Sequence, residues 1–396
     1  MKKLLIVAGG DWQCPIIHKA KDMGLYVVNT NLYQDSPGFK IADVGSVADV
    51  LDVESNLEIA RQQSVDAILT DQSDIAVPTV AKIADQLGLP GIGAEKAALF
   101  TNKHLMREFC AEKGFPIPPY KLCRDQSEAE DFINEHGFPC VVKPSASQSS
   151  RGVGKLTALD QLHHAFMVAL EHSKDGTVLL EGFIGGVELT VDGIQLNAGD
   201  HHCLATSCKT HYEHNEMIAN RLLFSQKHDT IDYDALHKQH NRMIEEMQLP
   251  FGLTHAEYKY FNGDFYLIEV AARGGGTRLS SDIVPLMSGV NSNELLIRMA
   301  LGEAVSEVAP SCPEIVSVLD FFEFSPGRIN NITGVERAKS LKGVIALGLS
   351  VKVGEVIHPA ADDRSRHGFV IAYANTLQAL ESLLDEVCST LQVQYE

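Results

Sequence analysis

The sequence predicts a multidomain protein of mixed α/β and α+β class. We expect an N-terminal parallel α/β domain over 1–100, a two-lobed domain over 101–310 and a small C-terminal α+β subdomain over 311–396. In the first hundred residues, short apolar strands alternate with helices, which favours a parallel sheet covered on both faces. Further along, two apolar runs flank a tight Asn-Gly-Asp turn, which is typical of an antiparallel hairpin.

Composition and charge exclude several classes of protein. The chain has 396 residues, of which 45% are hydrophobic and 21% charged, so it is neither wholly disordered nor collagen-like. Its formal net charge is −19, and a field of that sign repels nucleic-acid phosphates and anionic lipid surfaces. We therefore expect no nucleic-acid partner and no membrane association. A small anionic ligand would need a local cluster of Lys, Arg and backbone N–H groups.

The cysteines and the first residues favour a cytoplasmic protein. The 8 Cys are scattered without any Cys-x-x-Cys pair, which is typical of reduced thiols. The opening apolar run ends at Ala8, too early for a signal peptide. The sequence leaves the oligomeric state open, with a homodimer as one alternative.

The elements of the first domain follow from its apolar runs. Gly9-Gly10 after the first strand is weak evidence for a dinucleotide site, because Asn29 to Asn31 replace the acidic residue that such a site needs. We favour a docking or substrate-facing domain. The predicted strands span 4–8, 26–29 and 67–70, and the predicted helices span 15–23, 55–63 and 78–87.

The remaining chain alternates helices with paired strands. The proline-containing connector over 114–119 cannot continue a helix. A polar loop over 145–154 between two strands predicts a hairpin flap. Helices are expected over 103–113, 160–171, 234–247, 293–301 and 377–391, and strands over 140–144, 155–157, 178–181, 187–197, 253–260, 265–270 and 369–374.

Two lysines and the polar loop predict an anion site. Lys143 stands in an apolar strand, so its ammonium needs a carboxylate partner or an anionic ligand. Small residues in the loop that follows would let backbone N–H groups close over a polyphosphate, with Lys103 as a second cation. The alternative is a mobile surface hairpin, and no Walker sequence is present.

Glu257 and Glu269 predict a metal site. Each lies in one strand of the predicted hairpin, so pairing would place both carboxylates on one face. Two like charges tolerate each other there with a cation between them, and Mg²⁺ suits oxygen ligands. The alternative is that nearby Lys or Arg side chains pair with both carboxylates.

Two glycine-rich segments complete the candidate site. Arg273 is followed by Gly274 to Gly276, which would offer a guanidinium and free N–H groups to a carboxylate or phosphoryl group. Glu181 to Glu188 could meet an adenine and a ribose, although this signal alone is weak. The segment 209–221 is interpreted either as a substrate-side loop or as solvated surface.

Taken in order, these segments resemble the ATP-grasp superfamily. The relevant branch contains biotin carboxylase, carbamoyl phosphate synthetase, the purine-pathway ligases and the L-amino acid ligases, and the chain is most similar to the last of these. The match spans nearly the whole chain and rests on the order and spacing of its motifs. Those motifs are the aspartate-punctuated run 43–74, Thr101-Asn102-Lys103, the strand 138–144, the Glu181 hinge, the Glu257 and Glu269 pair and the segment 364–371.

The resemblance implies roles for particular residues. It implies that ATP and Mg²⁺, with Mn²⁺ as an alternative ion, are used. Arg273 and Gly275 would act on the acyl group, and Glu257 and Glu269 would bind the metal. One departure is Ala271, where the family commonly has a metal-binding Asn. The implied ATP-binding residues are Lys103, Lys143, Ser149, Gly152, Glu181, Gly182, Ile184 and Glu188.

The resemblance also implies a reaction. A carboxylate would attack the γ-phosphorus of ATP, and an amine would then displace phosphate from the acyl phosphate. The expected partners are thus a small carboxylate and an amine, with an amino acid favoured. The alternatives are a purine-pathway-type ligase or bicarbonate-dependent carboxylase, a phosphotransferase, and a non-catalytic ATP-binding regulatory protein, which only Ala271 favours.

Overall fold

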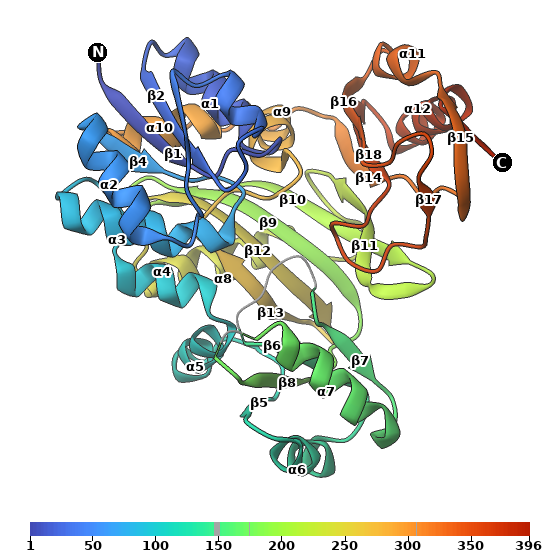
Figure 1. Cartoon of the computed structure of the whole chain (residues 1–396). Coiled ribbons are helices and arrows are strands. Elements are labelled where there is room, and N and C mark those ends of the chain that lie inside the picture. The colour runs from blue at the N-terminus through green and yellow to red at the C-terminus, as the bar shows by residue number, and fades with distance from the viewer. Residues whose placement is uncertain (146–150, 174, 306) are drawn as a thin grey trace.

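The computed structural model describes residues 1–145, 151–173, 175–305 and 307–396. Within them, the chain forms four sheets, and Figure 1 shows the N-terminal and C-terminal parts lying above a central sheet, with a smaller lobe below. The mixed α/β and α+β class predicted from the sequence is confirmed. None of the helices in this part of the chain combines the length and hydropathy that a membrane crossing requires.

The N-terminal sheet is parallel, as predicted, with the order β3-β2-β1-β4. Leu4 and Ile6 of β1 pack with α1, whereas Leu5 and Val7 pack with α2 and α3 on the other face. Alternate residues of one strand therefore enter two separate cores. The elements are β1 (Lys3–Val7), α1 (Cys14–Asp22), β2 (Tyr26–Asn31), β3 (Val44–Val47), α2 (Val53–Gln63), β4 (Ala67–Leu69) and α3 (Val77–Leu87).

The smaller lobe is a four-stranded antiparallel sheet with the order β5-β8-β6-β7. The amide of Lys103, at the start of α5, donates to the carbonyl of Ser145 just after β6, so the helix start and the strand end are joined. The elements are α4 (Ala94–Thr101), α5 (Lys103–Lys113), β5 (Tyr120–Cys123), α6 (Gln126–His136), β6 (Cys140–Pro144), β7 (Gly154–Leu156), α7 (Leu162–Glu171) and β8 (Val178–Gly182).

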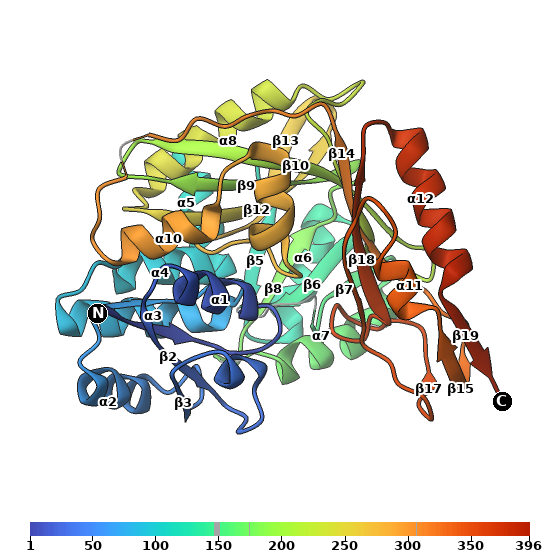
Figure 2. The ribbon, with the colours of Figure 1, turned by 90° about the horizontal axis from the view of Figure 1, so that it is seen from above.

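An eight-stranded sheet, ordered β13-β12-β9-β10-β11-β14-β18-β16, forms the centre of the molecule. The predicted hairpin is its β12–β13 edge. Three strands from the last quarter of the chain continue the same sheet, which Figure 2 shows from above. The elements are β9 (Val187–Gln195), β10 (His201–Tyr212), β11 (Asn215–Phe224), α8 (Tyr233–Met247), β12 (Gly252–Phe261), β13 (Asp264–Ala271), α9 (Val284–Ser288), α10 (Ser292–Ala300), β14 (Val316–Phe321), β16 (Val344–Leu349) and β18 (Gly368–Ala374).

The C-terminal part adds a three-stranded sheet, ordered β17-β15-β19, and two helices. Leu380 and Leu384 of α12 pack with Val318 and Val370 of the central sheet, which ties this part to the rest of the molecule. The elements are β15 (Gly327–Thr333), α11 (Val335–Lys339), β17 (Val356–Ile357), α12 (Leu377–Thr390) and β19 (Gln392–Tyr395).

Short turns of 3-10 type span Pro37–Lys40, Asp74–Ala76 and Leu159–Gln161, and a π turn spans Leu279–Ile283.

The segment 209–221 is mostly strand and not a loop. It belongs to the β10–β11 hairpin, whose turn lies at 213–214, and Thr210, Glu213 and Glu216 are exposed. Lys209 is buried within β10 between two carboxylates. A sequence of lysine, histidines and asparagines resembles a surface loop when the partners of those side chains are not visible.

Candidate active site

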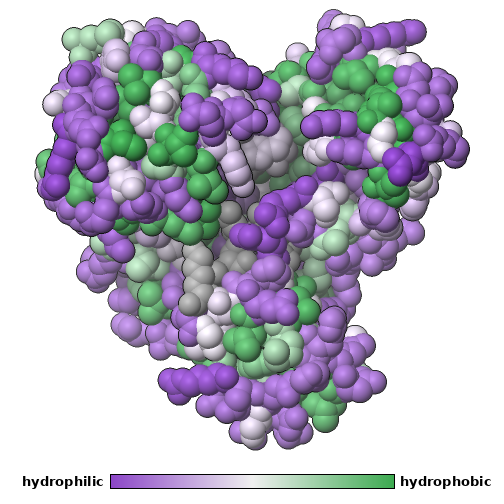
Figure 3. Space-filling model, viewed as in Figure 1, coloured by the Kyte–Doolittle hydropathy of each residue, from purple (hydrophilic) through white to green (hydrophobic). Residues whose placement is uncertain are grey.

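A cavity of about 700 Å³ lies where the N-terminal sheet, the smaller lobe and the central sheet meet. Figure 3 shows the molecule hollowed between these parts. The cavity brings together residues that are far apart in the sequence. The predicted site residues that line it are Lys103, Lys143, Glu181, Gly182, Ile184, Glu188, Glu257, Glu269 and Arg273.

Lys143 is held by a buried carboxylate. Its Nζ lies 2.6 Å from Glu181 Oε2, and Arg107 Nε donates to Glu181 Oε1 at 2.7 Å. One carboxylate therefore balances two cations, and one positive charge remains for a ligand. The side chain of Glu181 is fully engaged, so a contact of this residue with adenine would come from its backbone.

The charges in this cluster shift each other's titration. Burial lowers the pKa of Lys143 to about 8, and Glu181 only partly opposes that effect because Arg107 and Lys103 are also nearby. Burial disfavours the charge of Glu181 as well, but Arg107 and Lys143 outweigh burial and hold the pKa of its carboxyl below the usual range. Lys143 is thus the cation of this group that can lose its proton near neutral pH.

Glu257 and Glu269 stand directly opposite each other on β12 and β13. Each already faces an ammonium: Lys209 Nζ lies 2.5 Å from Glu257 Oε1, and Lys103 Nζ lies 2.7 Å from Glu269 Oε1. The predicted pairing on one face is present, and so is the alternative, in which lysines pair with both carboxylates. Among the described residues, no group of three or more His, Cys, Asp or Glu could hold a metal alone.

Glu188 lies among three basic side chains. Lys209 is 2.9 Å from one carboxylate oxygen, and Lys259 and His211 are 2.8 and 3.2 Å from the other. Burial opposes the charge of Glu188, but Lys209 and the other bases hold its pKa well below the usual range. A ribose hydroxyl would have to share these oxygens with Lys209, Lys259 and His211.

Arg273 is clamped by the N-terminal domain. Its Nε and Nη2 donate to the two oxygens of Asp74 at 2.8 and 2.6 Å, and Nη1 donates to the carbonyl of Gly274 at 2.9 Å. A guanidinium has five N–H donors, so two remain for a ligand. Asp74 outweighs the effect of burial and holds the pKa of Arg273 above its usual range.

A second aspartate fixes the glycine loop. Asp71, fully buried after β4, accepts from the amide of Gly274 at 3.0 Å and from Ser280 Oγ at 2.7 Å. A Cβ at Gly274 would lie 2.3 Å from the Ser280 side chain, so the close approach requires glycine. Gly275 packs against Asp192 and does not line the cavity, whereas Gly276 does.

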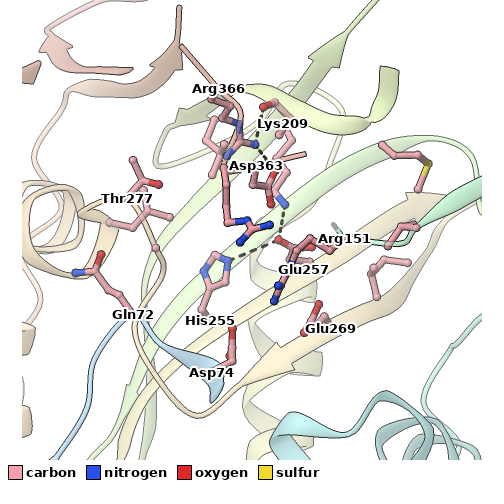
Figure 4. Close-up of a pocket in the computed structure, with 18 of the residues that line it drawn as sticks. Gln72, Asp74, Arg151, Lys209, His255, Glu257, Glu269, Thr277, Asp363 and Arg366 are labelled. Atoms are coloured by element: carbon pink, nitrogen blue, oxygen red, sulfur yellow. Dashed lines mark hydrogen bonds and ion pairs between the residues drawn. The ribbon is translucent and has the colours of Figure 1, made fainter. Parts of the chain in front are cut away.

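His255 lies beside the metal candidates. Its Nδ1 is 2.9 Å from Asp192 Oδ1, and its Nε2 is 3.8 Å from Glu257 Oε1. Figure 4 shows the side chains of His255 and Glu257 pointing toward each other. Burial lowers the affinity of His255 for a proton, but Asp192 outweighs burial and raises its pKa to about 9. His255 also stands directly opposite Ala271, the position where the family commonly has Asn. An imidazole and a methyl group therefore occupy this end of the hairpin.

Two predicted ATP-binding residues are not among the described residues that line the cavity. Ser149 falls outside the described residues. Gly152 is packed against His172 and Pro144 in a left-handed conformation with φ +70° and does not line the cavity.

Sequence reasoning did not assign roles to Asp74, Arg107, Lys209 or His255. For His255 a signal existed, because a residue two positions before Glu257 in a strand shares its face. No local signal pointed to the other three residues. Their partners lie 21 to 199 residues away in the sequence.

Comparisons with known proteins match two parts of the chain to known domains. Residues 136–282 match the ATP-grasp domain, and residues 320–396 match the L-amino acid ligase C-terminal domain 2. A curated relative, the formate-dependent phosphoribosylglycinamide formyltransferase of Sulfurisphaera tokodaii, is 24% identical over 99% of this chain and 97% of its own. The enzyme of the same name from Hydrogenovibrio crunogenus is 28% identical, but the match spans about half of each chain, 51% and 52%.

A solved structure is similar over the whole chain. The L-amino acid ligase from Bacillus licheniformis has a TM-score of 0.87 and 22% identity, covering 100% of this chain and 99% of that one. At this level of identity the likeness shows the fold.

The clamp on Arg273 generates a stability prediction. Asp74→Asn should lower the free energy of unfolding by about 3 kcal/mol, because it leaves a buried guanidinium without its counter-charge. Urea denaturation measures this loss. The matched control is Glu303→Gln, which breaks an Arg–carboxylate pair of 3.0 Å whose side chains are 38% and 42% exposed. That change should cost less than about 1 kcal/mol. Equal losses in the two variants would contradict the clamp.

Proposed function

We propose that this chain, which matches the ATP-grasp domain and the L-amino acid ligase C-terminal domain 2, is a ligase that releases ADP. It would join an amino acid or small carboxylic acid to an amine through an acyl phosphate. ATP-grasp enzymes use ATP and Mg²⁺. The substrates proposed here are a small carboxylate and an amine.

The observation that carries this proposal is the direct opposition of Glu257 and Glu269 within a wall of basic residues. Two carboxylates on neighbouring strands, each already attracting a cation, are a donor set that fits Mg²⁺, with phosphate oxygens and water as the further ligands. Bound there, Mg²⁺ would neutralise charge on the transferring phosphoryl group. Ala271 supplies no ligand, so we propose that the two glutamates are the protein's main contribution.

The basic side chains would position the nucleotide. Lys143 and Lys103 can exchange their carboxylate partners for phosphate oxygens, since phosphoryl transfer needs chiefly positioning and charge neutralisation. The two remaining donors of Arg273 would align the substrate carboxylate and later stabilise the oxyanion formed when the amine attacks. In the first step a carboxylate oxygen bonds to the γ-phosphorus and ADP leaves. In the second, the amine nitrogen bonds to the acyl carbon, loses a proton, and phosphate leaves.

The second candidate is a ligase of the purine-pathway type or a bicarbonate-dependent carboxylase. Two curated relatives are named formate-dependent phosphoribosylglycinamide formyltransferase, which favours this candidate. Their sequence identity is below 30%, so substrate identity has to be measured.

Hydroxylamine trapping tests the proposal. An acyl phosphate made from an organic acid should react with hydroxylamine to give a stable hydroxamate that requires ATP and Mg²⁺. Formate would give formohydroxamate, whereas bicarbonate gives no organic hydroxamate and a phosphoester is inert. We expect hydroxamate with an amino acid and its loss in Arg273→Ala. ADP release that follows bicarbonate alone would transfer the assignment to the carboxylase candidate.

Lys143 is expected to bind phosphate. In Lys143→Met, Glu181 keeps Arg107 as its partner, so the variant should fold. Loss of one charge-assisted bond of about 1.5–3 kcal/mol should weaken ATP binding roughly 10- to 100-fold in titration calorimetry. Lys121→Met is the control, because Lys121 pairs with Asp131 near the surface and does not line the cavity. Unchanged affinity in Lys143→Met would exclude the phosphate role.

The pH dependence follows from the same residue. Because Lys143 in the free protein loses its proton near pH 8, ATP affinity should fall above that pH, by up to tenfold per pH unit. Below about pH 8 the ammonium is present and the affinity should be constant. Lys143→Met should show no such fall, and a similar fall in the variant would assign the titration to another group.

The Glu269→Gln variant tests whether Glu269 binds the metal that the reaction needs. Glu269→Gln should abolish carboxylate-dependent ADP release while the protein remains folded, since it removes one metal-binding charge at a polar site. ADP release is followed with a coupled assay, and the melting temperature of the same variant is measured to show that it is folded. Ala271→Asn is the companion variant and should retain or raise activity. An active Glu269→Gln enzyme would argue against the metal role.

A further inference from the structure

One residue of β13 has no opposite residue on β12. Glu257 stands opposite Glu269. The next pair along is Tyr258 with Leu267, so Ile268 is left out of the pairing. An extra residue of this kind is a β-bulge, which re-aims the side chains beyond it. Without the bulge, Glu257 would stand opposite Ile268, and Glu269 would project from the other face of the sheet. The bulge therefore brings the two proposed metal-binding carboxylates together.

The packing of β13 shows the same shift. Leu267 and Val270 are three residues apart, yet both belong to the core on the α8 side of the sheet. In a regular strand, residues three apart project from opposite faces. Ile268 and Glu269 are consecutive, yet both line the cavity. The alternation of β13 thus changes at Ile268.

Arg107 of α5 contacts this bulge. β13 is the edge strand of the sheet, so the backbone groups on its outer side need partners from outside the sheet. Arg107 is fully buried, and its Nη2 donates to the carbonyl of Ile268 at 2.6 Å. Lys103, one helical turn earlier, lies 2.7 Å from Glu269. Residues four apart share one face of a helix, so one face of α5 meets both residues of the bulge.

The same guanidinium also holds Glu181. Its Nε donates to Glu181 Oε1 at 2.7 Å, and Lys143 lies 2.6 Å from Oε2. Because the donors of a guanidinium form a planar fork, Arg107 serves a carboxylate on β8 and a carbonyl on β13 at once. Arg107 is not among the described residues that line the cavity. One side chain behind the cavity wall therefore links the phosphate lysine to the strand of the metal carboxylates.

We propose that Arg107 is a positioning residue that acts on ATP through two other groups. It holds the Ile268 bulge in the register that presents Glu269 to Mg²⁺, and it shares Glu181 so that Lys143 can contact a phosphate. This inference rests on the proposed function and adds a residue that touches neither nucleotide nor substrate. Without Arg107, Glu181 and Lys143 would form a neutral pair, and the carboxylate would compete with phosphate for the ammonium.

The charged groups that face Lys143 come from two elements. Glu181 lies on β8, and Arg107 and Lys103 lie on α5. Burial lowers the pKa of Lys143 to about 8, Glu181 opposes this effect, and the cations Arg107 and Lys103 add to it. Removal of Arg107 should therefore raise the pKa of Lys143 and keep its charge to higher pH.

The first test is the pH dependence of ATP binding in Arg107→Met, measured by titration calorimetry. Glu181 keeps Lys143 as its partner in this variant, so no buried carboxylate is left alone. ATP should bind at least about fivefold more weakly at pH 7, because Glu181 then competes for Lys143. The alkaline fall in affinity should move up by at least about one pH unit. Weaker binding with the fall unmoved would indicate a purely structural role and overturn the proposal.

A second-site change tests the link through Glu181. Arg107→Met/Glu181→Gln removes the competing carboxylate and should bind ATP at least about fivefold more tightly than Arg107→Met. The control is Arg221→Met, which removes a guanidinium that pairs with Asp320 and Glu381 and is not among the described cavity residues. It should lower the melting temperature and leave ATP affinity within about twofold. A double variant that binds no better than Arg107→Met would contradict the link.

Arg107→Lys separates charge from geometry. An ammonium keeps a positive charge beside Glu181 but lacks the planar fork that also holds Ile268. The alkaline fall should therefore stay at its wild-type pH. The gain in ATP affinity on adding Mg²⁺ should shrink at least about threefold, because Glu269 is held less well in its place. An unchanged gain would overturn the role at the bulge. If Arg107→Met does not fold, this variant and its Mg²⁺ response decide.

These binding measurements also separate the inference from the proposed function. If no acid supports hydroxamate formation or ADP release, while the Arg107 variants change ATP binding as expected, the ligase activity fails and the positioning role stands. If the wild type forms hydroxamate and the Arg107 variants bind ATP and Mg²⁺ as the wild type does, the positioning role fails and the ligase stands.

Discussion

The cost of burying charge organises this molecule. The cavity wall holds lysines, arginines, glutamates and aspartates within one largely buried region, and a buried ion without a partner would cost several kcal/mol. Three of the ion pairs join different elements: Arg107 joins α5 to β8, Lys103 joins α5 to β13, and Arg273 joins the end of β13 to the N-terminal domain. The domains therefore have to pack in the arrangement that gives each of these buried charges its partner.

The same balance explains how an acidic protein could accept a polyanion. The overall charge is −19, yet Glu181 is shared by two cations, and Lys209 lies between two carboxylates. Nucleotide phosphates and a divalent cation could replace these internal partners, phosphate for carboxylate and metal for ammonium. An exchange of this kind keeps charge paired at each stage, so it avoids the large desolvation cost of an isolated ion.

The N-terminal domain contributes to the site without carrying a nucleotide motif. Asp71 and Asp74 follow its last strand, and they hold the glycine loop and Arg273 through buried hydrogen bonds. Trp12 follows its first strand, meets Phe369 of β18 edge to face and lines the cavity. The loops at the carboxyl ends of a parallel sheet commonly carry binding groups, and here they fix and cover a site that is built on another sheet.

The sequence by itself determined the elements whose signals are local. The helix Lys103–Lys113 begins after the Asn102 cap and ends at Gly114 in the left-handed conformation, and the strand Cys140–Pro144 is apolar except for Lys143. The hairpin that carries Glu257 and Glu269 followed from its two-residue turn, but their direct opposition did not. The register that begins at Phe261 and Asp264 would pair Glu257 with Ile268, and a register shift between Glu257 and Tyr258 brings Glu269 opposite instead.

Only the tertiary structure decided which partner each charged residue has. Arg273 and Asp74 are 199 residues apart, and Lys209 meets Glu257 across 48 residues. The junction of β11 with β14, which places Leu222 opposite Leu319, likewise joins distant segments. Such contacts depend on the register and docking of whole sheets. A local pattern fixes the face on which a side chain lies, but not the distant element that packs against that face.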